Sequence, residues 1–146
     1  MIDLGHFIAA QDRMYAGALS ELQAGHKRGH WIWFVFPQVA GLGRSSTSRK
    51  FAIADLDEAD AYLAHPVLGE RLRTCVRTML GHEGRSARSI LGGLDAMKFR
   101  SSLTLFAVAT AGEPDRELFD RALEAFFSGQ PDERTLQLLG VDSLDG

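Results

Sequence analysis

Asp95, Lys98 and Ser102 are spaced at i, i+3 and i+7, so a helix would place all three side chains on one face. On that face Asp95 could act as a general base, Lys98 could stabilise negative charge, and the Ser102 hydroxyl could contact a polar ligand. We take these three as candidate catalytic residues and the adjacent Ser101 as a candidate ligand contact. A structural interpretation fits the same pattern: a helix-capping Asp95, its ion pair with Lys98, and small serines at a helix contact.

The stretch HWIWFVFPQ, residues 30–38, supplies a second set of candidate ligand-binding residues: His30, Trp31, Trp33 and Gln38. Indoles, amides and an imidazole are groups that line clefts for planar or sugar-like ligands. Gln11 joins them, because it lies on an apolar helical stripe and a buried amide needs hydrogen-bond partners. A ligand could supply those partners, and so could a neighbouring backbone or indole group. A lone histidine near a helix start also fits a structural role.

The segment GLGRSSTSRK, residues 41–50, is a third candidate, for binding phosphate. Backbone N–H groups at a new helix start, together with Arg44, Arg49 and Lys50, could hold an anion. Arg44 and Ser45 are the residues we assign to ligand binding. The spacing is not that of a P-loop, because no Gly-Lys-Ser/Thr follows at the required distance. A turn with Ser45 or Ser46 as helix cap, followed by a solvated basic face, is the alternative.

Composition and absent motifs exclude several other classes of function. The sequence has no HExxH, CxxC pair, GxSxG or GxGxxG, and five scattered histidines with one cysteine do not predict a metal site, so we expect no metal and no cofactor. A net charge of -3 disfavours nucleic acid as the main partner. No apolar run reaches the roughly 18 residues of a membrane helix, and the first residues do not resemble a secretory signal. We therefore expect a cytoplasmic protein without a membrane partner.

Apolar residues recur every three or four positions in three stretches, which predicts amphipathic helices over 4–24, 67–80 and 118–127. The buried stripe of the second includes Cys75, which we expect to be an inert thiol. Shorter helices are predicted over 46–53, 57–64, 86–91 and 132–139, and a longer one over 95–110. At 146 residues without a linker or repeat, the chain is predicted to form one all-α, compact multihelical domain spanning residues 1–146.

The apolar run WIWFVF, residues 31–36, could by local propensity form a buried strand. Its only plausible partner is LTLFAVAT, residues 103–110, and one isolated strand pair is marginally stable. A helix satisfies its own backbone groups, so we predict a short central, aromatic-rich helix over 29–36, ended by Pro37.

Blocks throughout the chain resemble those of a bacterial domain family of unknown function: AAQDRMYAGALSELQAGHKRGHWIWFVFPQVAGLG, AYLAHPVLGERL, DAMKFRSSLTLF and FFSGQPDERTLQLLG. Some members carry an automatic calpastatin label. The resemblance implies a compact multihelical fold and no established activity. Calpastatins resemble extended disordered inhibitors, whereas this chain has its apolar residues spaced for a core.

These observations favour two classes of function. The first is binding or hydrolysis of a small molecule, nucleotide-like or a sugar phosphate, in a cleft between helices. For that class we expect Gln11, His30, Trp33, Gln38, Asp95, Lys98 and Ser102 to meet around one cleft. The alternative is a non-catalytic protein-interaction domain, which would expose an apolar patch instead. Whether the protein is an enzyme, and its oligomeric state, do not follow from the sequence.

Overall fold

All regular elements in the computed structural model of the chain, which describes residues 2–146, are helices. They are α1 (Gly5–Ala24), α2 (Ile32–Val35), α3 (Ser46–Lys50), α4 (Leu56–Ala64), α5 (Leu68–Leu80), α6 (Ala87–Leu91), α7 (Gly93–Ala109), α8 (Arg116–Phe127) and α9 (Glu133–Leu139). The all-α prediction is confirmed. No helix within residues 2–146 is long and apolar enough to cross a membrane.

Helix boundaries follow the capping residues in the sequence. Gly25 ends α1 in the left-handed conformation (φ 73°), and its N–H donates to the carbonyls of Glu21 and Leu22. At the N-terminal ends, the Ser45 side chain accepts a hydrogen bond from a backbone N–H of α3. The Asp55 and Asp132 side chains accept equivalent hydrogen bonds from α4 and α9. These local hydrogen bonds explain why most boundaries lie within a few residues of the predicted ones.

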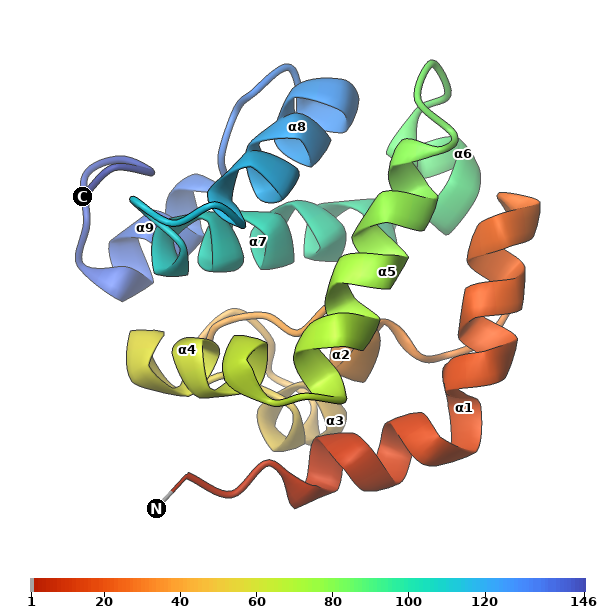
Figure 1. Ribbon diagram of the computed structural model, residues 1–146, viewed down its shortest axis with the longest axis horizontal. Coiled ribbons are helices and arrows are strands. Elements are labelled where there is room, and N and C mark those ends of the chain that lie inside the picture. The colour runs from red at the N-terminus through yellow and green to blue at the C-terminus, as the bar shows by residue number, and fades with distance from the viewer. Residues whose placement is uncertain (1) are drawn as a thin grey trace.

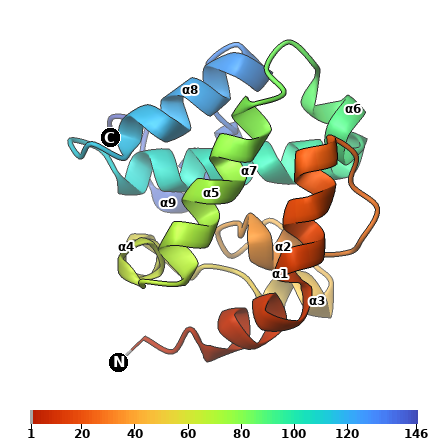
Figure 2. The ribbon, with the colours of Figure 1, turned by 45° about the vertical axis from the view of Figure 1, so that its right-hand side comes forward.

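Helix α7 crosses the middle of the molecule, with α8 on one side and α4 on the other (Figure 1). Its side chains Phe99, Leu103 and Phe106 are fully or almost fully buried, and α2, α6 and α9 also contact it. Helix α5 passes over α7 and packs against α1, α4 and α8, as Figure 2 shows from a second direction. Helix α1 changes direction sharply part-way along its length in both views. The core therefore surrounds α7 and the segment that precedes Pro37.

The segment Trp31 to Phe36 is the aromatic centre predicted for the core. Trp31 and Phe36 are almost fully buried, and the Phe36 ring lies 4.7 Å from the ring of Phe99 on α7. The helix within it is shorter than predicted, since α2 spans only 32–35 rather than 29–36. The Glu21 carboxylate on α1 accepts hydrogen bonds from the N–H groups of Arg28 and Gly29 at 2.7 and 2.9 Å. These bonds attach the chain before Trp31 to α1, and that segment is not helical.

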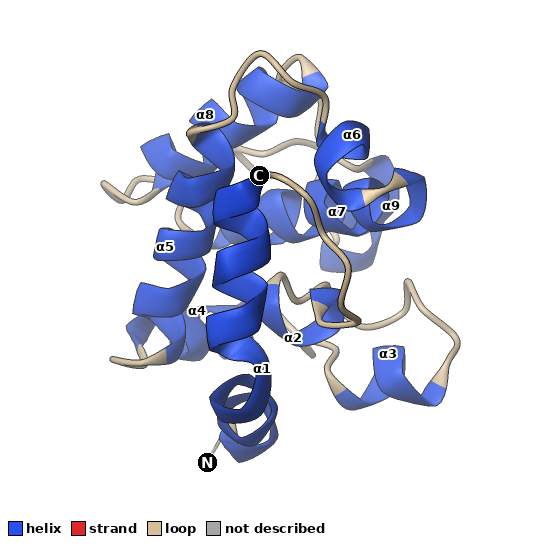
Figure 3. Cartoon of the chain, turned by 90° about the vertical axis from the view of Figure 1, so that its right-hand side faces the viewer, coloured by secondary structure: helices blue, strands red, loops and turns tan. Residues whose placement is uncertain are grey.

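The chain between α2 and α4 folds as a loop around the short helix α3. A single parallel β-bridge pairs Val39 with Ile53. It is closed by two backbone hydrogen bonds of 2.8 Å, from Ala40 N to Ile53 O and from Ile53 N to Gln38 O. Figure 3 shows α3 at the edge of the molecule, on the side where α7 and α9 also lie. This bridge holds the two ends of the loop together and fixes where Gln38 stands.

Candidate functional site

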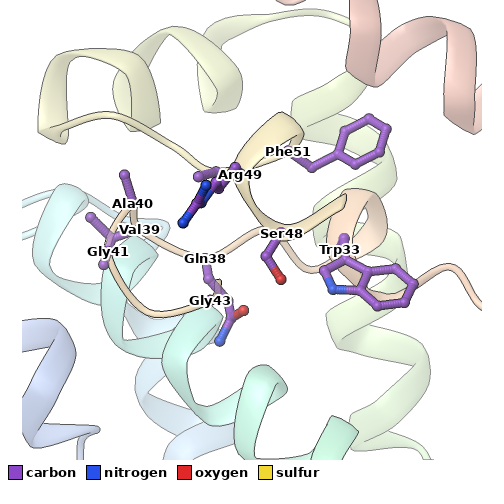
Figure 4. A pocket seen from close by; sticks show the side chains of 10 residues that line it. Trp33, Gln38, Val39, Ala40, Gly41, Gly43, Ser48, Arg49 and Phe51 are labelled. Atoms are coloured by element: carbon purple, nitrogen blue, oxygen red, sulfur yellow. The ribbon is translucent and has the colours of Figure 1, made fainter. Parts of the chain in front are cut away.

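A pocket of about 230 Å³ lies between α2, α3 and the loop that joins them; we call it the Trp33 pocket. Its walls combine aromatic, amide, hydroxyl and guanidinium groups with exposed backbone. They are Trp33, Gln38, Val39, Ala40, Gly41, Gly43, Ser48, Arg49, Phe51 and Ala52. In Figure 4 the Ser48 side chain lies between those of Arg49 and Trp33. One end of the pocket is therefore cationic and the other aromatic.

Gly43 packs closely against Ser48, and both residues line the Trp33 pocket. A Cβ atom on Gly43 would lie 2.3 Å from the Cβ of Ser48, so no larger residue fits there without moving α3. The Ser45 hydroxyl donates to the Ser48 hydroxyl at 2.9 Å and accepts from the Ser48 backbone N–H at 3.1 Å. Because the Ser48 oxygen accepts that bond, its own proton is free to donate to a ligand. Ser45 thus orients Ser48.

Positive charge at the Trp33 pocket is not neutralised within the protein. Arg49 makes no ion pair with any of residues 2–146, and the same holds for the neighbouring Arg44 and Lys50. Lys50 lies over the face of the Phe51 ring, 5.3 Å from its centroid. In a protein of net charge -3, three cations without acidic partners within seven residues create a local attraction for anions.

A second cavity, of about 320 Å³, adjoins the first; we call it the Met97 groove. It lies between the loop 38–48 and the helices α7 and α9. Its lining is Gln38, Leu42, Gly43, Ser48, Leu94, Met97, Lys98, Ser101, Asp132 and Arg134. Gln38, Gly43 and Ser48 line both cavities, which are therefore neighbours across these three residues.

An ion cluster beside these cavities involves two of the candidate catalytic residues. The Asp95 carboxylate lies 2.6 Å from the Lys27 ammonium and 3.4 Å from that of Lys98. Lys27 also donates to the carbonyl of Gly29 and lies over the Trp31 ring at 4.9 Å. Lys98 lies 5.0 Å from the centroid of the Trp33 ring. Asp95 therefore links α7 to the segment before α2 and helps hold Lys98 against Trp33.

The Glu21 carboxylate anchors the other side of that segment. Besides two backbone N–H groups, it accepts the indole N–H of Trp31 at 3.0 Å. Partial burial acts to raise the pKa of Glu21, but the hydrogen bonds from Gly29, Arg28 and Trp31 and the nearby Lys27 outweigh it and lower the pKa. The buried indole of Trp31 is thus satisfied inside the protein.

The predicted site residues divide into three groups in the structure. Trp33 and Gln38 line the Trp33 pocket, and Gln38, Lys98 and Ser101 line the Met97 groove. Trp31, Gln11 and Ser102 are buried and line neither cavity. His30, Arg44 and Ser45 are exposed. Of the seven residues expected to meet around one cleft, Trp33, Gln38 and Lys98 line these cavities and Asp95 is paired with Lys98, whereas Gln11, His30 and Ser102 line neither.

Gln11 has protein partners for its amide nitrogen, which donates to the carbonyl of Phe34 at 2.6 Å and to the Tyr62 hydroxyl at 2.9 Å. Its amide oxygen and the hydroxyl of Ser102 are buried and have no hydrogen-bond partner among residues 2–146. The hydroxyl of Ser101 donates to the carbonyl of Met97, one turn earlier on α7. Gln11 therefore ties α1 to α2 and α4.

Ser48, Arg49 and Phe51 are pocket residues that the site assignment from sequence did not include, although Arg49 belongs to the segment proposed for phosphate. The assignment chose Arg44 and Ser45 at the start of that segment. A signal was present, because a helix capped by Ser45 brings positions 48 and 49, one turn later, to the same side as the cap.

Comparison with known proteins places the chain in a family without an assigned function. The sequence profile of the family described as "Protein of unknown function (DUF1810)" matches residues 1–139. The chain belongs to this family. No curated protein matches it. Among solved structures, the crystal structure of the conserved hypothetical protein Rv1873 from Mycobacterium tuberculosis is similar, with 44% identity and a TM-score of 0.90, covering 96% of this chain and 98% of that chain. The resemblance to a bacterial family of unknown function is confirmed.

Proposed function

We propose that the protein binds a small anionic molecule, nucleotide-like or a sugar phosphate, in the Trp33 pocket. The observation that carries the proposal is the unpaired Arg49 at one end of a pocket whose other end is the Trp33 indole. A guanidinium is well suited to phosphate because its planar donors match the phosphate oxygens. The Gln38 amide and the Ser48 hydroxyl, whose O–H can donate, add neutral hydrogen-bond donors to the lining.

The size of the pocket narrows the ligand class. Ligand cavities commonly measure about 300–1,000 Å³, and the Trp33 pocket, at about 230 Å³, is smaller. A phosphorylated sugar or one half of a nucleotide fits such a volume, whereas a large cofactor does not. The aromatic wall favours a ligand with a ring.

Hydrolysis of the bound molecule would be a further step beyond binding, and it would depend on Asp95, Lys98 and Ser102. The Asp95 carboxylate is shared by two ammonium groups, so its oxygens already have partners within the protein. The Ser102 hydroxyl lies buried outside both cavities. Lys98 lines the Met97 groove and could stabilise negative charge on a bound phosphate. The geometry supports binding more directly than it supports hydrolysis.

A thermal-shift screen tests the proposal, with adenosine monophosphate, ADP-ribose, ribose 5-phosphate and inorganic phosphate as probes and adenosine as the uncharged control. A ligand at a hundred times its Kd adds about 2.7 kcal/mol of stability. That raises the Tm by about 5–11 °C for a domain of this size. The shift should disappear in Arg49→Met and persist in Arg13→Met, which removes a solvent-exposed guanidinium on α1.

Two results would count against ligand binding at this site. One is the absence of a shift with every anionic probe, and the other is an equal shift in Arg49→Met and in the wild type. Loss of the shift in Lys98→Met and Asp95→Asn would extend the site to the ion cluster. Release of inorganic phosphate or of a base from a bound probe would establish hydrolysis.

A non-catalytic interaction domain is the second candidate function, because α7 exposes two large apolar side chains. Leu94 is 78% exposed and Met97 is 67% exposed. A partner protein could cover them. Failure of the ligand screen would leave this candidate as the better supported one.

A further inference from the structure

The Trp33 pocket and the Met97 groove form one continuous surface. Gln38, Gly43 and Ser48 belong to both linings. In Figure 4 the Gln38 side chain extends from its loop toward the neighbouring helix, on the side of the Met97 groove. The Lys98 ammonium provides a second link, because it lines the groove and lies against the Trp33 ring of the pocket. A ligand that fills the pocket therefore has the groove directly beside it.

The boundary between the two cavities is suited to a phosphate that connects two groups. Arg49 stands on the pocket side and Lys98 on the groove side of the shared residues. One carboxylate, that of Asp95, is paired with two ammonium groups, Lys27 at 2.6 Å and Lys98 at 3.4 Å, so these three residues together keep a net positive charge. The Gln38 amide and the Ser48 hydroxyl supply neutral donors between these cations. An anion held here contacts both cavities.

The groove beyond this boundary has three large apolar side chains, Leu42, Leu94 and Met97. Ser101, Asp132 and Arg134 complete its lining. Exposed apolar side chains that lie together often mark a binding site, and Leu94 and Met97, one turn apart on α7, are the two most exposed of the large apolar side chains among residues 2–146. The flexible thioether of Met97 can adapt to a ring or to a short chain.

We infer that the natural ligand is a phosphodiester or related phosphate compound with a ring group in the Trp33 pocket and an apolar group in the Met97 groove. This inference rests on the proposed function, because the phosphate must first be held beside Arg49. It differs from that function in assigning the groove to the same ligand rather than to a partner protein.

Two esters of adenosine monophosphate, the methyl ester and the phenyl ester, test the inference. Both carry a single negative charge on the phosphate, so they differ in the apolar group alone. Isothermal titration should give a Kd for the phenyl ester about tenfold or more below that of the methyl ester, in line with the effect of added apolar contact in a binding site. In Leu94→Ser/Met97→Ser the difference should vanish, because the phenyl group loses its added contact with the groove.

The double variant Met14→Ser/Val67→Ser is the matched control, because it removes two exposed apolar side chains from α1 and from the residue before α5. It should retain the preference for the phenyl ester. Equal Kd values for the two esters, or a preference that survives in Leu94→Ser/Met97→Ser, would overturn the inference while the proposed function stands. If neither ester nor adenosine monophosphate binds, both the inference and the nucleotide form of the proposed function are wrong.

Discussion

Replacement of Phe36 by alanine should strongly destabilise the fold. The Phe36 ring is fully buried and contacts the rings of Trp31 and Phe99, with centroids 6.3 and 4.7 Å away. Truncation removes these contacts and leaves a cavity between α2 and α7, and Phe→Ala changes in cores cost about 3–5 kcal/mol. For a domain of this length, each kcal/mol lowers the Tm by about 2–4 °C, so the expected decrease is about 6–20 °C.

Differential scanning calorimetry and urea unfolding measure this change. Met97→Ala serves as the control, because Met97 is mostly exposed and surface substitutions usually alter stability by about 0.5 kcal/mol or less. A Tm for Phe36→Ala within the range of that control would refute the conclusion that the segment 31–36 is the centre of the core. A decrease confined to the slope of the urea transition would instead indicate a change in the unfolded state.

Two further predictions concern buried or hydrogen-bonded titratable groups. The folded-state pKa of Glu21 lies below the ordinary 4.5, so its contribution to stability is present above that value and is lost as the pH falls through the folded pKa. The free energy of unfolding, measured with urea, should therefore depend less steeply on pH in this acidic range for Glu21→Gln than for the wild type. Identical pH profiles would contradict the assigned hydrogen bonds. Burial raises the pKa of the Cys75 thiol to about 12, so a thiol reagent at mildly alkaline pH should label the protein only after denaturant is added. Rapid labelling of the native protein would show that Cys75 is accessible.

The long helices could be predicted because their signals are local. The stripe of α1 ends at Gly25, which adopts the left-handed conformation that glycine favours, and that of α5 ends at Gly81. The length of α2 could not be predicted in the same way. Its start depends on Glu21, seven or more residues earlier, whose carboxylate holds the Arg28 and Gly29 N–H groups and the Trp31 indole in a segment that is not helical. A hydrogen bond to a distant side chain leaves no periodic pattern in the sequence.

The candidate site was predictable by segment and less so by residue. The sequence pointed to 30–38 and 41–50, and the Trp33 pocket is built from the stretch 33–52. Arg44 precedes α3 and Arg49 lies on it, so which of the two arginines reaches the pocket depends on which face of α3 turns inward. That orientation is set by the bridge between Val39 and Ile53 and by the contact of Gly43 with Ser48, both of which are tertiary features. The pairing of Asp95 with Lys27 likewise requires α7 to lie beside the end of α1.

The bridge between Val39 and Ile53 also bears on which part of the chain can change within the family. The walls of the Trp33 pocket come from one continuous stretch of twenty positions, 33–52, and the bridge closes the part of it that follows Gln38. Insertions and substitutions between the bridged residues can therefore reshape the pocket while the helices around α7 keep their packing. Exchange of the segment 38–53 between this protein and its mycobacterial relative should therefore leave the rest of the fold intact, because the bridge holds both ends of the segment.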